Sequence, residues 1–344
     1  MPFHCLPNVT NLKGTDESMG NEREYRYKKP WIIQRADPYV YHHTDGYYYF
    51  TASYPMFGPN DPEGYGRIIL RRSETLDGLA EAKEYTIWKK HDNGPMSWHI
   101  WAPEIHYLFG KWYIYFAAGE RDNVWAIRPY VLECDSQDPI TGNWTEKGKM
   151  QRADEDTFSF EAFSLDATVF ENKGKYYYVW AEKVGVGAQI SNLYIAEMES
   201  PYKLKTVQVQ LTTPDYDWER VGHWVNEGPG VIKHNGKIFL TFSASETGIA
   251  YCVGILCADE TSDLLDPRSW TKERYPVLKT CEELGIYGPG HNSFTTDEDG
   301  RDIIVFHART EKEIEGNPLY NPNRHAMYMR VQWNEDGYPD FSME

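Results

Sequence analysis

The chain has no surplus of basic residues. Its 344 residues include 35 Lys and Arg against 52 Asp and Glu, which gives a formal net charge of −17. Such an acidic protein repels nucleic acid and anionic membrane surfaces, so neither is an expected partner. A neutral ligand is compatible with this charge.

Cysteines are few, and long apolar runs are missing. The five cysteines have no metal-ligand spacing and are expected to be free buried thiols: Cys5, Cys134, Cys252, Cys257 and Cys281. No stretch approaches the ~20 consecutive apolar residues of a membrane-spanning helix. Residues 1–20 also lack the basic start and apolar core of a secretion signal. These absences predict a cytoplasmic protein.

Aromatic residues, by contrast, are abundant and lie in short alternating segments. The chain has 12 Trp and 26 Tyr, and aromatic or β-branched residues that alternate with polar ones are typical of strands. After a polar lead-in at residues 1–23, strand patterns continue without a break in composition. We therefore expect an all-β protein with a single domain over residues 24–344.

Five hairpin signals of one kind recur along the chain. Each is a Gly-containing turn followed by an aromatic or β-branched strand. A polar residue precedes each hairpin, at intervals of 61 to 67 residues: Asp37, Glu104, Asp166, Glu227 and His291. This period predicts a five-bladed β-propeller, in which the five positions converge at one end of the central channel. Residues 327–333 are expected to close the ring by pairing with a strand near residues 31–34.

Three carboxylates stand out because their neighbours are small, apolar or proline. Asp37, Asp166 and Glu227 should be partly removed from water, which is costly unless each is paired or protonated. They could simply accept backbone hydrogen bonds at strand entrances. Their matching positions favour chemistry instead, and grouped acids suit glycoside hydrolysis, which needs one protonated acid and one ionised carboxylate. With His291 nearby, the cluster could also bind a divalent cation.

The ordered motifs RADP, WAPEIH, SLDAT, NEGP and GPGHNSF resemble those of glycoside hydrolase family 43, over about residues 33–333. Members are five-bladed propellers that cleave arabinose- and xylose-containing polysaccharides with inversion. The resemblance implies that Asp37 is the general base, that Asp166 tunes and orients the acid, and that Glu227 is the general acid. It also implies that His291 faces a cation, commonly calcium, held largely by waters. No organic cofactor is expected.

The same resemblance suggests residues that bind the sugar. Trp101 and Arg309 match residues of the family's sugar site, and weaker candidates are Glu104, Asn192 and Asn292. Other aromatic residues beside the acids could stack on a pentose ring or simply pack: Trp98, Trp224 and Tyr287.

Within the family, several runs resemble those of exo-acting α-L-arabinofuranosidases, which release arabinose from α-1,5-linked arabinan and its oligosaccharides. These runs are DGYYYFTA, SWHIWAPEIH, GKWYIYFAAG and YGPGHNSF. Three alternatives stay open: a β-xylosidase or bifunctional enzyme, a propeller that only binds sugar, and a retaining enzyme of the fructan-cleaving type. In the last of these, Asp37 would be a nucleophile.

Overall fold

The structure, a computed structural model, describes residues 28–184 and 189–343, and within them the protein is all-β. Helical structure in these ranges is limited to three short 3-10 turns: η1 (Asp77–Ala80), η2 (Asp217–Glu219) and η3 (Pro267–Ser269). No helix in the described part of the chain is long and apolar enough to cross a membrane. The predicted lead-in at residues 1–23 lies outside the described residues.

Two separate four-stranded antiparallel sheets come first in the chain. One contains β2 (Ala36–His42), β3 (Tyr48–Ser53), β4 (Arg67–Ser73) and β5 (Tyr85–Lys89) in that order. The next contains β6 (Trp98–Leu108), β7 (Lys111–Glu120), β8 (Asn123–Cys134) and β9 (Thr145–Lys149). In both, neighbours in sequence are neighbours in space, as hairpin connections require.

A nine-stranded sheet follows. Its first part is β10 (Ser164–Asn172), β11 (Lys175–Val184) and β12 (Ile190–Ser200), with β13 (Lys203–Leu204) and β14 (Val209–Thr212) beside β12. Its second part is β15 (Trp224–His234), β16 (Lys237–Ala244), β17 (Cys252–Asp259) and β18 (Thr271–Lys272). A short parallel pairing between β12 and β15 is the link between the two parts.

The last large sheet joins the two ends of the described chain. It has the order β1 (Lys28–Ile32), β21 (His325–Arg330), β20 (Asp302–Arg309) and β19 (Tyr287–Thr296). The pairing of β1 with β21 confirms the expected pairing between the N-terminal and C-terminal strands. A small hairpin follows, β22 (Gln332–Trp333) and β23 (Pro339–Asp340).

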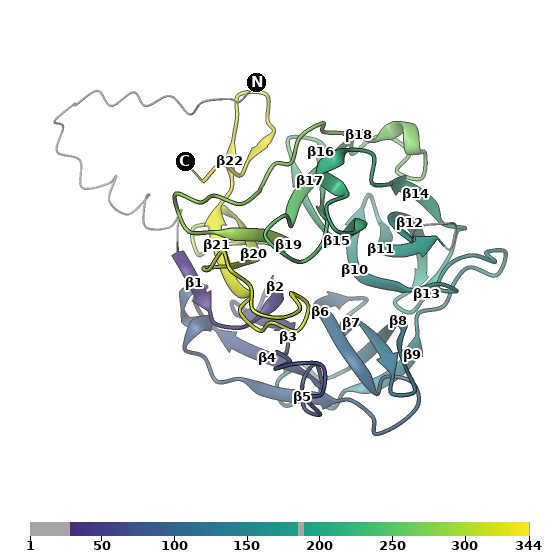
Figure 1. Ribbon diagram of the computed structural model, residues 1–344. Coiled ribbons are helices and arrows are strands. Elements are labelled where there is room, and N and C mark those ends of the chain that lie inside the picture. Colours follow the sequence, from purple (N-terminus) through teal and green to yellow (C-terminus); the bar gives the residue numbers. More distant parts are fainter. Residues whose placement is uncertain (1–27, 185–188, 344) are drawn as a thin grey trace.

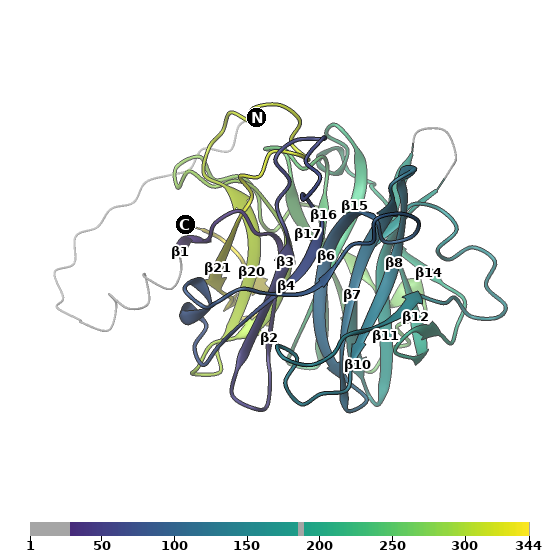
Figure 2. The same cartoon turned by 90° about the horizontal axis from the view of Figure 1, so that it is seen from below.

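The first strands of the hairpins surround a common centre. Strands β2, β6, β10, β15 and β19 each contact the next in this cyclic order, and β19 contacts β2. Figure 1 shows these five strands nearest the middle, with the later strands of each sheet outside them. Seen from the side in Figure 2, the strands run between two faces that carry the loops.

Aromatic side chains fill the space between neighbouring sheets. Trp112, Trp180 and Phe239 are among the largest fully buried side chains. The predicted Gly turns are confirmed: at Lys173–Gly174, for example, both residues have positive φ, the conformation of a type I′ hairpin turn. The cysteines that the structure describes are free, as expected, while Cys5 lies outside them.

Candidate active site

Each of the five central strands breaks its hydrogen-bond register near its beginning. The breaks lie in β2, β6, β10, β15 and β19. In each strand one such break includes a residue with a positive φ between 45° and 54°: Asp37, Ala102, Asp166, Gly228 and His291. Strands β6 and β19 have a second break, at which His99 and Gly288 also have positive φ. Such bulges turn a side chain out of the regular alternation, and here they do so on one end of the ring.

The backbone corrects the expected alignment of the repeats. The five positive-φ residues are 62 to 65 residues apart, so the equivalents of Asp37 in the second and fourth units are Ala102 and Gly228. The prediction that Glu104 and Glu227 hold the matched positions is therefore wrong. Glu104 lies two residues after the matched position, and Glu227 lies one residue before it. A bulge inserts a residue into one strand, and the spacing of acids cannot locate it.

Asp37 is buried and surrounded by positive or donating groups. Its Oδ2 accepts a hydrogen bond of 2.5 Å from Ser53 Oγ. Its Oδ1 lies 3.3 Å from His291 Nδ1, 3.3 Å from His307 Nδ1 and 3.5 Å from Arg324 Nη1. Burial opposes ionisation, but the charges on His291 and Arg324 and the contact with His307 outweigh it and hold the pKa of Asp37 below its usual range. This carboxylate is therefore ionised at neutral pH.

Asp166 and Glu227 are the other two acids near His291. Asp166 Oδ2 accepts the Gly228 N–H at 3.2 Å and lies 3.8 Å from His291 Nδ1. Glu227 Oε1 accepts a hydrogen bond of 2.9 Å from the Tyr251 hydroxyl. His291 is thus placed between Asp37 and Asp166, and its own backbone N–H donates to Ser243 Oγ at 2.6 Å.

The electrostatics of these two acids are opposite to those of Asp37. Burial, with the charges on Glu227 and Asp37, raises the pKa of Asp166 to about 8, against the opposing charge of His291. Burial and the charge on Asp37 raise the pKa of Glu227. The two groups titrate together, so the last proton that they lose is shared by the pair. This proton stays bound up to mildly alkaline pH. One ionised carboxylate thus faces a protonated pair.

The charge on His291 depends on the same carboxylates. Burial lowers its pKa, but the charges on Asp37, Asp166 and Glu227 outweigh burial and raise it. A protonated His291 offsets part of the negative charge that the three acids bring together.

Gly228 is required by its conformation and by its neighbour. Its φ is +53°, and a Cβ at this position would lie 3.1 Å from His291 Cγ. We expect Gly228→Ala to lower the free energy of unfolding by about 1–2 kcal/mol for the left-handed backbone, plus a further ~1–3 kcal/mol for the overpacking. Activity should fall because His291 must shift.

The matched control for this substitution is Gly236→Ala. Gly236 has φ +76° and open space around its Cβ position, so it carries the backbone strain without the clash. Urea unfolding of both variants measures the difference. Equal losses of stability in the two variants would contradict the close packing of Gly228 against His291.

Three of the predicted binding residues lie near the carboxylates. Glu104 is buried in β6, where its Oε2 lies 2.9 Å from His106 Nε2. Asn292 follows His291 and donates to Thr241 Oγ1 at 2.9 Å. Trp101 precedes Ala102, whose N–H donates to the Ser53 hydroxyl that binds Asp37.

Two predicted binding residues have other partners. Arg309 is buried, and its guanidinium donates to Asn321 Oδ1 at 2.7 Å and to the Pro318 carbonyl at 2.8 Å, so it anchors the loop between β20 and β21. Asn192 lies on β12, the third strand of its unit, and donates to Tyr194 and Gln210. Neither makes a hydrogen bond to the three acids in the described part of the chain.

Four residues of the site were missed at the sequence level: Ser53, Tyr251, His307 and Arg324. They come from second strands or from loops rather than from the repeated motifs. The Arg324 Nη2 donates to the Tyr65 hydroxyl at 2.9 Å, while its Nη1 faces Asp37. The one available signal was its position after a long polar loop, beside the closing strand.

The structure offers little direct ligation for a metal. Among the described residues, no three His, Cys, Asp or Glu side chains form a group that could hold an ion. His291 Nδ1 faces Asp37 and Asp166, and within the described ranges its Nε2 has no hydrogen-bond partner. A directly chelated ion does not fit these residues, whereas an ion held by waters beside Nε2 is compatible with them.

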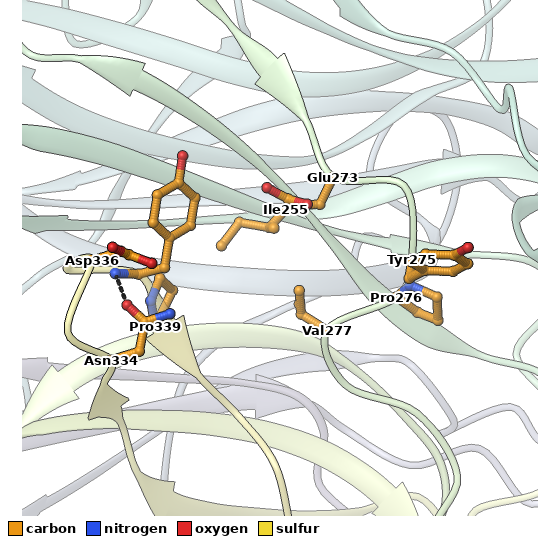
Figure 3. A pocket seen from close by; sticks show the side chains of 9 residues that line it. Ile255, Glu273, Tyr275, Pro276, Val277, Asn334, Asp336 and Pro339 are labelled. Carbon is orange, nitrogen blue, oxygen red and sulfur yellow. Dashed lines mark hydrogen bonds between the residues drawn. The ribbon is translucent and has the colours of Figure 1, made fainter. Parts of the chain in front are cut away.

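A separate hollow of about 480 Å³ lies outside the ring. Figure 3 shows Glu273 and Asp336 on its lining and the Tyr275 ring at one side. It is bounded by the chain between β17 and β19 and by the β22–β23 hairpin.

The chain has well-defined relatives. It matches the model of glycosyl hydrolases family 43 over residues 27–339. An extracellular exo-α-(1→5)-L-arabinofuranosidase of Streptomyces avermitilis is 49% identical over 318 residues, which cover 92% of this chain and 63% of that protein. One of Streptomyces chartreusis is 49% identical over 293 residues, covering 85% of each. A crystal structure of α-L-arabinofuranosidase from Lactobacillus brevis has a TM-score of 0.85 and 48% identity, covering 93% of this chain and 97% of that one.

These relatives overturn one expectation. The two Streptomyces proteins are named extracellular, so the predicted cytoplasmic location is wrong. That prediction depended on the lack of an apolar leader in the first residues, and such a lack does not determine a compartment. The family resemblance, in contrast, is confirmed over nearly the whole sequence. The chain belongs to glycosyl hydrolases family 43.

Proposed function

We propose that this protein is an exo-acting α-L-arabinofuranosidase that releases L-arabinose from α-1,5-linked arabinan or its oligosaccharides with inversion. The observation that carries the proposal is the division of the three acids into one ionised carboxylate, Asp37, and one protonated pair, Asp166 and Glu227. Inverting hydrolysis needs this division. The names of relatives 49% identical to this chain support the choice of substrate.

In this proposal Asp37 is the general base. It takes a proton from the attacking water, while Ser53 and Arg324 keep it ionised beforehand. Its backbone N–H donates to His307 Nδ1 at 3.1 Å, which helps to hold its orientation. A crevice of about 10 Å³ beside it, lined in part by Ser53 and Arg324, is close to the least space that one water needs.

Glu227 is the general acid. Tyr251 donates to its Oε1, which leaves Oε2 to carry the proton toward the leaving oxygen. Asp166 accepts the N–H of Gly228, the residue after the acid, and so fixes the backbone that presents Glu227. When Asp166 is ionised, its negative charge also disfavours loss of the proton that remains on Glu227.

The fold that holds these groups is proposed to be a single five-bladed propeller domain. Five central strands contact one another in a cycle, and the nine-stranded sheet divides into two units at the short β12–β15 pairing. An experimental structure with a different number of radial units would contradict this count.

A water-held cation beside His291 stays a proposal. If it binds there and supports activity, chelation should reduce the rate and calcium should restore it. An unchanged rate and unchanged melting temperature in the chelated protein would contradict it.

The substrate is tested by product analysis. Arabinotriose, p-nitrophenyl α-L-arabinofuranoside and p-nitrophenyl β-D-xyloside are offered to the protein separately. Free arabinose from the first two supports the proposal. Turnover of the xyloside without arabinose release would favour a xylosidase, and no turnover of any of them would favour a protein that only binds sugar.

The pH profile should report the protonated pair. Activity requires ionised Asp37 and one proton on Asp166 and Glu227, so kcat/KM on arabinotriose should fall as pH rises through the raised pKa of the pair, about 8 for Asp166. Replacing Asp166 by Asn removes the like charge that helps to keep the proton, so the alkaline limb should move to lower pH.

α-L-Arabinofuranosyl fluoride is the control for this profile. Fluoride leaves without being protonated, so its hydrolysis should lack the alkaline limb assigned to the acid. An unmoved limb in Asp166→Asn, or the same limb on both substrates, would contradict the role of the pair.

A further inference from the structure

Trp125 is a large aromatic residue exposed at the rim of the site. It lies near the start of β8, and its side chain is 51% exposed. Its ring centroid is 5.2 Å from that of His99, 6.2 Å from that of Trp101 and 6.5 Å from that of Phe163. Its exposed ring extends a buried aromatic cluster, unlike a single apolar residue scattered on the surface, which needs no explanation.

One end of this cluster lies beside the proposed base. His99 stacks on Trp101 at 4.3 Å with an angle of 21° between the rings. Trp101 also packs edge-on against Tyr65 at 5.7 Å, and the Tyr65 hydroxyl binds Arg324, which faces Asp37. The cluster is therefore continuous with the part of the site that contains Asp37.

The other end lies toward the proposed acid. Lys183 Nζ is 4.2 Å from the centre of the Phe163 ring, and the Lys183 N–H donates to the Phe163 carbonyl at 2.9 Å. The charges of Lys183 and Glu227 influence each other's pKa, in both cases favouring the charged form. Phe163 thus connects Trp125 with the acid side of the site.

The position of the acid decides which part of the substrate meets this surface. A general acid must lie beside the oxygen of the bond that breaks, so the sugar that leaves with that oxygen lies on the acid side. A flat, mostly uncharged aromatic surface suits a sugar ring, whose apolar face can pack on it.

We propose that Trp125 and Phe163 form the platform for the leaving-group sugar, the first sugar beyond the cleaved bond. The platform selects a neutral sugar over other leaving groups. This inference rests on the proposed glycosidase function and adds the residues that recognise the part of the substrate that is released.

The test compares two substrates that differ in the leaving group. α-1,5-Linked arabinotriose has a sugar on the leaving side, whereas α-L-arabinofuranosyl fluoride has none. For Trp125→Ala, the ratio of kcat/KM on arabinotriose to kcat/KM on the fluoride should fall about 10- to 100-fold, the effect of losing one apolar contact in a specificity pocket. Most of the change should be in KM for arabinotriose, and Trp125→Phe should restore part of the ratio.

Two other variants test the placement. Phe163→Ala should lower the ratio in the same direction, and it provides a second result if Trp125→Ala folds poorly. Trp224, 39% exposed, is the rival platform; like Phe163 it has a cation near one face, since the Arg220 guanidinium lies 4.6 Å from its ring centre. Tyr275→Ala is the matched control, because Tyr275 is 71% exposed and lines the outer hollow rather than the site of Asp37, Asp166 and Glu227.

The possible results distinguish a failure of the platform from a failure of the proposed function. An unchanged ratio in both Trp125→Ala and Phe163→Ala would overturn the platform, as would a loss confined to Trp224→Ala or Tyr275→Ala. Equal losses on both substrates would also overturn it, since they would indicate damage to the chemistry rather than to leaving-group binding. If the unaltered protein releases arabinose from neither substrate, the proposed function itself fails.

Discussion

Replacing Glu227 by Gln should lower kcat/KM on arabinotriose by about 10²- to 10⁴-fold, the usual contribution of a general acid. The amide keeps the size of the side chain and can still accept the Tyr251 hydrogen bond, so the loss should come from the missing proton. The arabinofuranosyl fluoride needs no proton for departure and should lose much less activity. Steady-state kinetics on the two substrates measure the difference.

The matched control is Glu273→Gln. Glu273 is an exposed carboxylate on the lining of the outer hollow. Its replacement should leave both rates near those of the unaltered protein. An equal loss on fluoride and arabinotriose in Glu227→Gln would show that Glu227 is not the proton donor.

Replacing Asp37 by Asn should lower kcat/KM by a similar factor, about 10²- to 10⁴-fold, but on both substrates. The attacking water needs a base whichever group leaves, so a good leaving group cannot compensate. Azide needs no base and should restore part of the rate by forming an arabinosyl azide of inverted configuration. The azide product and its configuration are read by NMR.

Stability must be measured together with this loss of rate. The Asp37→Asn substitution would leave the buried Arg324 without its nearby counter-charge, and removing one partner of a buried pair destabilises a protein by about 3–5 kcal/mol. Urea unfolding identifies the fraction folded under assay conditions. A folded Asp37→Asn protein that keeps full activity on both substrates would exclude Asp37 as the base.

Much of the central site was predictable because it is built from a repeated local pattern. Turn chemistry and alternating apolar residues indicated the hairpins, and their period indicated that Asp37, Asp166 and His291 would meet. These signals are local in sequence, and the ring then brings equivalent positions together.

The bulges were not predictable from the same pattern. Each depends on whether a residue adopts a left-handed conformation in competition with the regular strand, and residues as different as Asp37, Ala102 and Gly228 do so. Gly228 gave one hint, since Gly tolerates positive φ. The placement of Glu227 one residue before its unit's bulge could be found only in three dimensions.

The residues that surround Asp37 could likewise not be predicted from sequence patterns. His307 and Arg324 are far from it along the chain, and their contacts depend on how the last sheet packs at the centre. The loop contacts of Arg309 were also not indicated by its sequence position: its guanidinium binds Pro318 and Asn321, and its contact with the sugar stays a prediction.

The most direct test of the account is the anomeric configuration of the first product, followed by proton NMR during hydrolysis of arabinotriose. The account predicts that the newly released arabinose first appears as the β-anomer, inverted from the α-linked substrate, and mutarotates afterwards. First appearance of the α-anomer would mean net retention. It would contradict the assignment of Asp37 as a base that activates water and would make it a nucleophile instead.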